Sequence, residues 1–173
     1  MNIKLQDTHF QTSLLFLLFL LFTFSAEATS MSLLSKPEEK VVLFSPMKGT
    51  ITFKNKAASG AKIERKVSWK DQTGETDTTV SDENGEFELT ILEETVKLSK
   101  ISQFVVSQEI SVYYHGEKFL IWTMGKSSKN IYGELGGKPV NLTCELTDED
   151  MPHRFDDALL MTVCKWDSIE NNN

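Results

Sequence analysis

The stretch over residues 49–89 constrains the fold more than any other part of the chain. Apolar and polar side chains alternate over residues 47–54 and again over residues 61–69, with the period of a half-buried β-strand. A polar, threonine-rich run over residues 75–80 predicts a strand that faces solvent, and residues 81–87 (Ser-Asp-Glu-Asn-Gly-Glu-Phe) predict a hairpin with a tight turn. Strands joined by glycine-containing turns at this spacing predict a small antiparallel β-sandwich.

Turn-forming residues punctuate these strands. Asp82 suits the first position of a tight turn, and Asn84 and Gly85 tolerate a positive φ. The residues that we assign to structural turns are Gly49, Gly60, Asp82, Asn84 and Gly85.

Arg65 interrupts the apolar face that Ala61, Ile63, Val67 and Trp69 form by alternation. An inward-pointing charge in a strand either lies at a sheet edge, where it opposes aggregation, or pairs with a carboxylate. Both structural roles are favoured over a role for Arg65 in ligand binding.

The rest of the chain continues the strand pattern. Residues 103–114 and 118–124 predict a hairpin about His115-Gly116-Glu117, and further strands are predicted over residues 140–146 and 159–166. About seven to eight strands in all, with little helix, predict an all-β, immunoglobulin-like sandwich. The remaining assignments are a short helix or an irregular crossover at residues 92–102, an acidic loop at 147–157, the sandwich domain at 41–168 and a disordered tail at 169–173.

The N-terminal segment has the pattern of an export signal. Residues 14–24 form an uncharged run rich in Leu and Phe, and Ala26-Glu27-Ala28 follows as a small-x-small cleavage site. The run is shorter than the roughly 20 apolar residues that a spanning helix needs. We expect a cleaved signal peptide over residues 1–28, a linker over residues 29–40, a periplasmic or secreted protein and no transmembrane span after cleavage. An uncleaved membrane anchor and a cytoplasmic protein translated from Met31 are the alternatives.

Cys144 and Cys164 are the two cysteines of the chain. In an exported protein an even pair is most simply a disulfide. It would close a loop of about 20 residues and stabilise the fold by about 3 kcal/mol in the chain-entropy model. Translation from Met31 would favour two buried thiols instead.

Charge and composition bear on the partner class. The formal net charge is −7, and an acidic surface argues against binding to nucleic acid, which requires a basic stripe. The mature histidines His115 and His153 each lie in a polar or turn context. The acidic residues Asp148, Glu149, Asp150, Asp156 and Asp157 lack the alternation and the central glycine of an EF-hand loop.

Residues 49–52 (Gly-Thr-Ile-Thr), the turn at residues 55–63 and residues 81–87 resemble the motifs of carboxypeptidase regulatory-like (transthyretin-like) modules. Asn55 and Ala57 stand where Gly and Pro are usual in such modules. Three further features are similar to an uncharacterised bacterial branch, a domain of unknown function: Phe44-Ser45-Pro46-Met47-Lys48-Gly49, Trp69 and the string from Gly133 to Cys144. The resemblance implies a fold and a bacterial origin, and it implies no activity.

These patterns favour a binding function over catalysis. We expect no catalytic set, no cofactor and no metal site, and we take Trp122, Tyr113, His115 and Arg154 as a possible binding surface. The leading hypothesis is a non-enzymatic, exported accessory module that contacts a protein or a carbohydrate through sheet-edge and loop surfaces. One alternative is a small metal-dependent or hydrolytic enzyme that uses His115, His153 and the acidic loop. The other is a cytosolic partner-binding protein translated from Met31.

Overall fold

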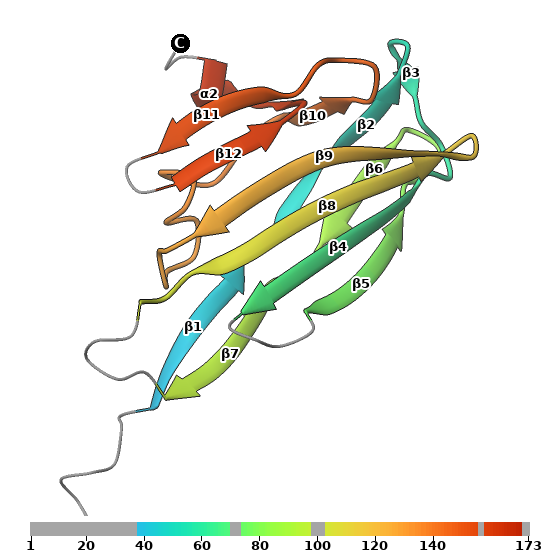
Figure 1. Cartoon of the computed structure of the whole chain (residues 1–173). Coiled ribbons are helices and arrows are strands. Elements are labelled where there is room, and N and C mark those ends of the chain that lie inside the picture. The colour runs from blue at the N-terminus through green and yellow to red at the C-terminus, as the bar shows by residue number, and fades with distance from the viewer. Residues whose placement is uncertain (1–37, 70–73, 98–102, 156–157, 171–173) are drawn as a thin grey trace, which may run out of the picture. The chain divides into compact units, whose positions relative to one another are not determined.

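The computed structural model describes residues 38–69, 74–97, 103–155 and 158–170 (Figure 1). The predicted signal peptide, the first nine residues of the predicted linker and residues 171–173 of the predicted tail lie outside these residues. Within them, no helix is long and apolar enough to cross a membrane. Apart from the short helix α2 (Asp167–Glu170), their regular structure consists of strands, which confirms the all-β prediction.

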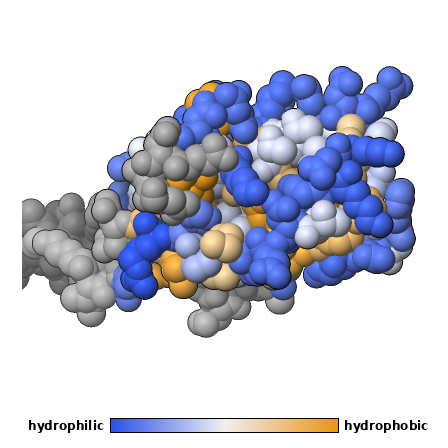
Figure 2. All heavy atoms as spheres, turned by 90° about the horizontal axis from the view of Figure 1, so that it is seen from above, coloured by the Kyte–Doolittle hydropathy of each residue, from blue (hydrophilic) through white to orange (hydrophobic). Residues whose placement is uncertain are grey.

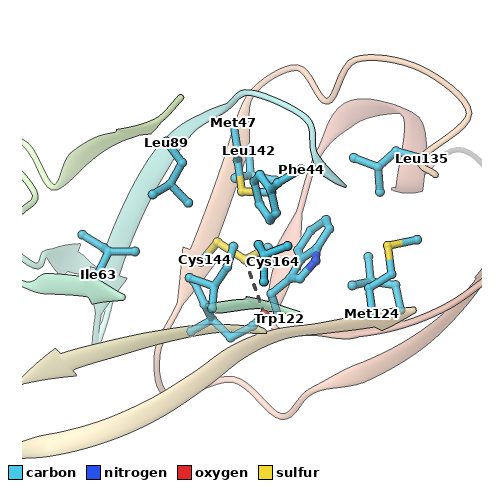
Figure 3. Packing of buried hydrophobic residues seen from close by; sticks show 14 of the residues in the cluster. Phe44, Met47, Ile63, Leu89, Trp122, Met124, Leu135, Leu142, Cys144 and Cys164 are labelled. Carbon is cyan, nitrogen blue, oxygen red and sulfur yellow. Dashed lines mark hydrogen bonds between the residues drawn. A yellow bond between two sulfur atoms is a disulfide. The ribbon is translucent and has the colours of Figure 1, made fainter. Parts of the chain in front are cut away.

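Two sheets pack on one apolar cluster, so the predicted β-sandwich is confirmed (Figures 1 and 3). The larger sheet has the order β11 (Met151–Phe155), β12 (Ala158–Thr162), β9 (Glu117–Lys126), β8 (Val106–Tyr114), β4 (Lys62–Trp69) and β5 (Glu75–Val80). The smaller sheet has the order β13 (Cys164–Lys165), β10 (Leu142–Glu145), β2 (Met47–Phe53) and β3 (Lys56–Ala57), and β6 (Glu86–Leu89) also pairs with β2. All these pairings are antiparallel except that of β2 with β10.

A two-stranded ribbon of β1 (Glu38–Phe44) and β7 (Leu92–Lys97) continues beyond the pairing of β2 with β6. The break between β1 and β2 contains Pro46, which has no backbone N–H for a sheet hydrogen bond. Such breaks and several very short segments give 13 strand segments in the described residues, more than the seven to eight expected. Residues 38–40 are strand rather than linker, residues 92–97 are strand rather than helix or crossover, and residues 151–155 are strand rather than loop.

The segment over residues 81–85 connects the two sheets, so the prediction of a hairpin there is wrong. The preceding strand β5 pairs with β4 in the larger sheet, whereas β6 pairs with β2 in the smaller sheet. Asp82 nevertheless acts as a turn former, because its Oδ1 accepts hydrogen bonds from the amides of Asn84 (2.9 Å) and Glu86 (2.8 Å). Gly85 has a φ of 78°.

Of the other predicted turn residues, two lie in turns and one does not. Gly60 lies in a turn with a φ of 74°, as expected. Asn84 also lies in a turn, but its φ is not positive. Gly49 lies inside β2, opposite Leu142 of the parallel strand β10, so its assignment to a turn is wrong.

Arg65 is fully buried in β4 and is paired with a carboxylate. Its Nε and Nη2 donate hydrogen bonds to the two carboxylate oxygens of Asp77 on β5, at 2.9 and 2.5 Å. Its guanidinium also lies 4.7 Å from the ring centroid of Phe44. The predicted pairing with a carboxylate is therefore confirmed, and the residue lies one strand in from the sheet edge.

A second buried charge, Lys126, holds the long loop that follows β9. Lys126 Nζ donates hydrogen bonds to Glu134 Oε2 (2.5 Å) and to the carbonyl of Asn130 (2.8 Å). Glu134 Oε1 accepts a hydrogen bond from the hydroxyl of Ser45 at 2.8 Å, and that hydroxyl accepts one from the amide of Tyr132 at 2.8 Å. Burial lowers the pKa of Lys126, and the bond and charge of Glu134 oppose this effect.

Candidate functional site

A disulfide holds the end of the sandwich at which the chain crosses from β12 to β13. Cys144 on β10 lies directly opposite Cys164 on β13, with 4.0 Å between their Cα atoms. Both cysteines are buried beside Trp122 (Figure 3), and the predicted disulfide is confirmed. Thr162 Oγ1 donates a hydrogen bond to the carbonyl of Ile121 (2.7 Å) and accepts one from the amide of Cys164 (2.9 Å), which fixes the crossing.

This crossing leaves part of one edge of β9 uncovered. Strand β12 pairs with β9 only at residues 122–124, and Figure 1 shows β12 beside only the C-terminal half of β9. Beyond Val163, whose amide donates to the carbonyl of Ile121 at 3.4 Å, the chain leaves this sheet. Among the described strands, residues 118–120 therefore pair with β8 alone.

A hollow of about 420 Å³ lies along this open edge. Residues 118–121 form one wall, and Leu146, Val163 and residues 148–150 line the remainder. We call Asp148, Glu149 and Asp150 the acidic rim. Asp148 pairs with Lys165 at 2.7 Å, whereas Glu149 and Asp150 are exposed and take part in no ion pair within the described residues.

Glu149 of the acidic rim also lines a second hollow, of about 310 Å³. His153 and Met151 of β11 line it together with Glu149, the crossing at residues 162–165 and Ile169. Burial lowers the pKa of His153 below its usual 6.5, which favours a neutral imidazole. Because Glu149 and Val163 line both hollows, the two hollows adjoin at these residues.

Glu145 directly precedes Leu146 of the first hollow and contacts a turn that is distant in sequence. Its two carboxylate oxygens accept hydrogen bonds from the amides of Lys54 (2.9 Å) and Asn55 (2.8 Å), the two turn residues between β2 and β3. Both turn residues have a positive φ (53° and 60°), as a tight hairpin of this type requires. Burial alone would raise the pKa of Glu145, but hydrogen bonds from Thr147, Asn55 and Thr52 outweigh it and lower the pKa to about 2.

Aromatic rings lie beside one end of the first hollow. The ring of Phe53 lies 5.7 Å from that of Tyr114, 5.7 Å from that of His115 and 6.0 Å from that of Phe119, between centroids. Phe119 also lines the hollow. His115 is therefore a ring-packing residue of the β8–β9 turn, where it has a φ of 51°.

The structure does not bring the four predicted surface residues together. Trp122 is 1% exposed, so its assignment to a binding surface is wrong. Tyr113 lies near the β8–β9 turn opposite Lys118, whereas Arg154 lies on β11 opposite Leu159. Continuing the register, these two positions lie seven residues apart along β9, about 23 Å at the usual rise of a strand.

The predicted alternative catalytic set is likewise dispersed. His153 is aligned through Leu160 with Met124, and His115 lies nine residues from Met124 along the chain, beyond the start of β9. His153 shares the second hollow with Glu149, whereas Asp148, Glu149 and Asp150 line the first hollow without a histidine. The described residues contain no group of three or more His, Cys, Asp or Glu that could hold a metal ion, and Asp156 and Asp157 lie outside these residues.

Two parts of this site have no signal in the local sequence. The Glu145 contacts join residues 90 or more positions apart, and no local sequence pattern predicts them. The open edge of β9 depends on where β12 ends. Figure 2 shows the face seen from above as mostly hydrophilic, with hydrophobic residues visible between polar ones.

Comparison with known protein families gives a match over more than half of the chain. The model of a family described as "Domain of unknown function (DUF6795)" matches residues 47–149. The match extends from β2 to Glu149 of the acidic rim, and it ends before β11, β12 and Cys164. No curated protein and no solved structure matches the chain.

Proposed function

The chain belongs to the DUF6795 family, and from this premise we propose that it is a non-enzymatic binding module whose acidic rim and adjoining hollows contact a partner protein. The observation that carries the proposal is the juxtaposition of three features. Two hollows share Glu149 of the acidic rim, a strand edge is uncovered beside the first hollow, and the disulfide of Cys164 and the contacts of Glu145 fix segments that border the hollows. A rigid, concave and charged surface is suited to recognition.

A protein partner is favoured over a carbohydrate. Sugar-binding surfaces commonly use exposed aromatic platforms, but Trp69, Trp122 and Trp166 are 5%, 1% and 2% exposed. A strand edge beside charged groups instead offers hydrogen bonds to a polypeptide backbone. Binding of a glycan to the same surface is the outcome that would select the carbohydrate class.

We propose further that the fold is of the carboxypeptidase regulatory-like (transthyretin-like) type, in a bacterial branch. Its support is the set of turns that carried the resemblance. Asn55, Gly60 and Gly85 each adopt a positive φ, at positions where the motif supplies residues that tolerate one. An experimental structure of a family member that aligned with a different sandwich topology would contradict this assignment.

The proposed location is the periplasm or the extracellular space. The disulfide supports it, because structural disulfides form and persist in oxidising compartments. The test is the intact mass of protein expressed from its full-length gene, after cell fractionation, with and without reduction and alkylation. A species that begins at Thr29 and is alkylated only after reduction supports export, whereas a cytosolic species that begins at Met31 with two thiols contradicts it.

The binding function is tested by cross-linking in the cells that naturally express the chain. The test variant D148N/E149Q/D150N neutralises the acidic rim. The matched control variant E75Q/E83Q/E88Q removes three exposed carboxylates elsewhere on the domain. We expect the wild type and the control to give the same cross-linked protein, and the rim variant to lose it. Equal cross-linking by all three proteins would contradict the proposal.

A metal-dependent enzyme is the second candidate, since Glu149 and His153 line one hollow. It is tested by elemental analysis of protein purified without a His-tag. A metal retained at one equivalent, and lost in a His153→Asn variant that remains folded, would replace the binding proposal with the enzymatic one. Metal at trace levels in both proteins supports the binding proposal.

A further inference from the structure

We propose that the hollow beside β9 binds an extended, cationic peptide segment that adds to β9 as an extra strand, with Lys or Arg side chains against the acidic rim. This inference rests on the proposed function and specifies the conformation and the charge of the partner. It is carried by three features: the orientation of the β9 backbone, the design of the other sheet edges and the charge of the hollow.

The backbone of β9 presents hydrogen-bonding groups toward the hollow. Tyr114 and Glu117 flank a two-residue turn, so they form a hydrogen-bonded pair and the pairing alternates from there. Lys118 opposite Tyr113 and Leu120 opposite Ser111 are then non-hydrogen-bonded positions. The N–H and C=O groups of Lys118 and Leu120 therefore point away from β8, toward the side that β12 does not cover.

The outer edges of the larger sheet carry charged side chains, as β9 does at Lys118, and one outer edge also contains a proline that opposes strand addition. At one edge, β11 contains Pro152, which cannot donate a ladder hydrogen bond, and the exposed charge of Arg154. At the other edge, β5 is polar and carries the exposed carboxylates of Glu75 and Asp77. The uncovered part of β9 contains no proline, and Leu120 is 51% exposed there, as Val80 (60%) on β5 and Met151 (56%) on β11 are at the outer edges. An accessible strand segment with an apolar side chain is the arrangement that strand addition uses.

The charge of the hollow selects a cationic occupant. Glu149 and Asp150 line it without an ion-pair partner among the described residues, and Asp148 is paired with Lys165. Lys118, the cationic side chain in the lining, lies 3.7 Å from Glu109 and 5.8 Å from the ring centroid of Tyr113. The ammonium group of Lys118 is thus directed toward groups on β8. The exposed carboxylates of Glu149 and Asp150 remain to attract the partner.

The same lining accepts apolar side chains between the charged ones. Leu146, Ile121 and Val163 are buried residues of the lining, and Phe119 is half-buried. An added strand places successive side chains on opposite sides, so apolar and cationic residues would alternate in a well-matched segment. The uncovered stretch from Glu117 to Leu120 is about 13 Å long, so it accommodates about four residues of an extended segment.

The experiment titrates the disulfide-bonded domain with a blocked eight-residue peptide of alternating Lys and Val. Backbone amide signals and hydrogen exchange are followed by NMR. We expect chemical-shift changes at Lys118 and Leu120 and slower exchange of both amides. Affinity should fall at least tenfold when alternate peptide amides on the bonding edge are N-methylated. It should fall at least fivefold for D148N/E149Q/D150N, and a Glu-Val peptide should not bind.

The N-methylated peptide leaves the protein unchanged, so its result does not depend on whether a β9 variant folds. Equal binding of the two Lys-Val peptides would overturn strand addition. So would shifts confined to other surfaces, the absence of binding, or concentration-dependent dimerisation through β9 that excludes the peptide. If cross-linking to a natural partner still depends on the acidic rim, such a result removes this inference and leaves the proposed function standing. If that cross-linking also fails, both are lost.

Discussion

The buried Lys126–Glu134 pair gives the sharpest prediction about stability. The two side chains are 0% and 2% exposed, and Glu134 also accepts the hydrogen bond of Ser45. Glu134→Leu would leave the Lys126 ammonium buried without its counter-charge, which costs about 3–5 kcal/mol. The described domain has somewhat more than 100 residues, so this loss corresponds to a fall in Tm of about 10–20 °C.

The double variant K126M/E134L separates pairing from packing. Replacing both charges by apolar groups of similar size removes the desolvation cost together with the attraction, so we expect stability within about 2 kcal/mol of the wild type. The matched control is Glu39→Leu, which breaks the exposed pair Lys129–Glu39 in the same region and should cost less than about 1 kcal/mol.

The assay is urea unfolding at pH 7, followed by tryptophan fluorescence, since all three tryptophans are buried in the core. The midpoint should fall strongly for Glu134→Leu, and it should recover in the double variant. A single variant no less stable than Glu39→Leu would refute the claim that the pair is buried and coupled. A double variant less stable than the single would refute the assignment of the loss to an unpaired charge.

Three further predictions concern the frame of the site. Glu145→Gln should flatten the dependence of stability on pH between about 4.5 and 2. In the wild type the folded pKa of Glu145 is about 2, below the usual 4.5, so the unfolded chain binds the proton first as the pH falls. Wild-type stability therefore falls as the pH falls through this window. Urea midpoints measured against pH check this, and an unchanged slope would count against the Glu145 contacts. Replacing Cys144 and Cys164 with Ser should cost about 3 kcal/mol for a separation of 20 residues, measured as a loss of unfolding free energy. Gly49→Ala would place a Cβ 2.8 Å from the carbonyl oxygen of Leu142, so it should cost about 1–3 kcal/mol in the same assay, and wild-type stability would disprove the close approach of β2 and β10.

Alternation in the sequence determined which faces of the strands are buried. Ile63, Val67 and Trp69 share the core face of β4 because the period of a strand is two, whatever its neighbours are. The hairpin at His115-Gly116 also follows from local chemistry, as two residues of positive φ join adjacent strands. With two cysteines in the chain, the disulfide had one possible pairing, which the structure contains.

Tertiary structure decided which strands are neighbours. Residues 81–85 have the residues of a hairpin turn, yet β5 and β6 join different sheets because each pairs with a strand distant in sequence. The position of Trp122 depends on a bulge in the pairing of β8 with β9: Ile110 pairs with Trp122 and Ser111 with Leu120, which leaves Ile121 as an extra residue. Ile121 and Trp122 are therefore both buried, and alternation counted along the sequence cannot register such an extra residue.

The proposed site is likewise a product of the tertiary structure. The acidic composition of residues 148–150 was visible in the sequence, but the hollow beside them exists because β12 ends at Thr162 and the chain crosses to the other sheet. Glu145 orders the turn at Lys54 and Asn55 across about half the chain. Local sequence sets the direction in which each side chain points, whereas a surface depends on contacts between distant segments, which only the packed fold specifies.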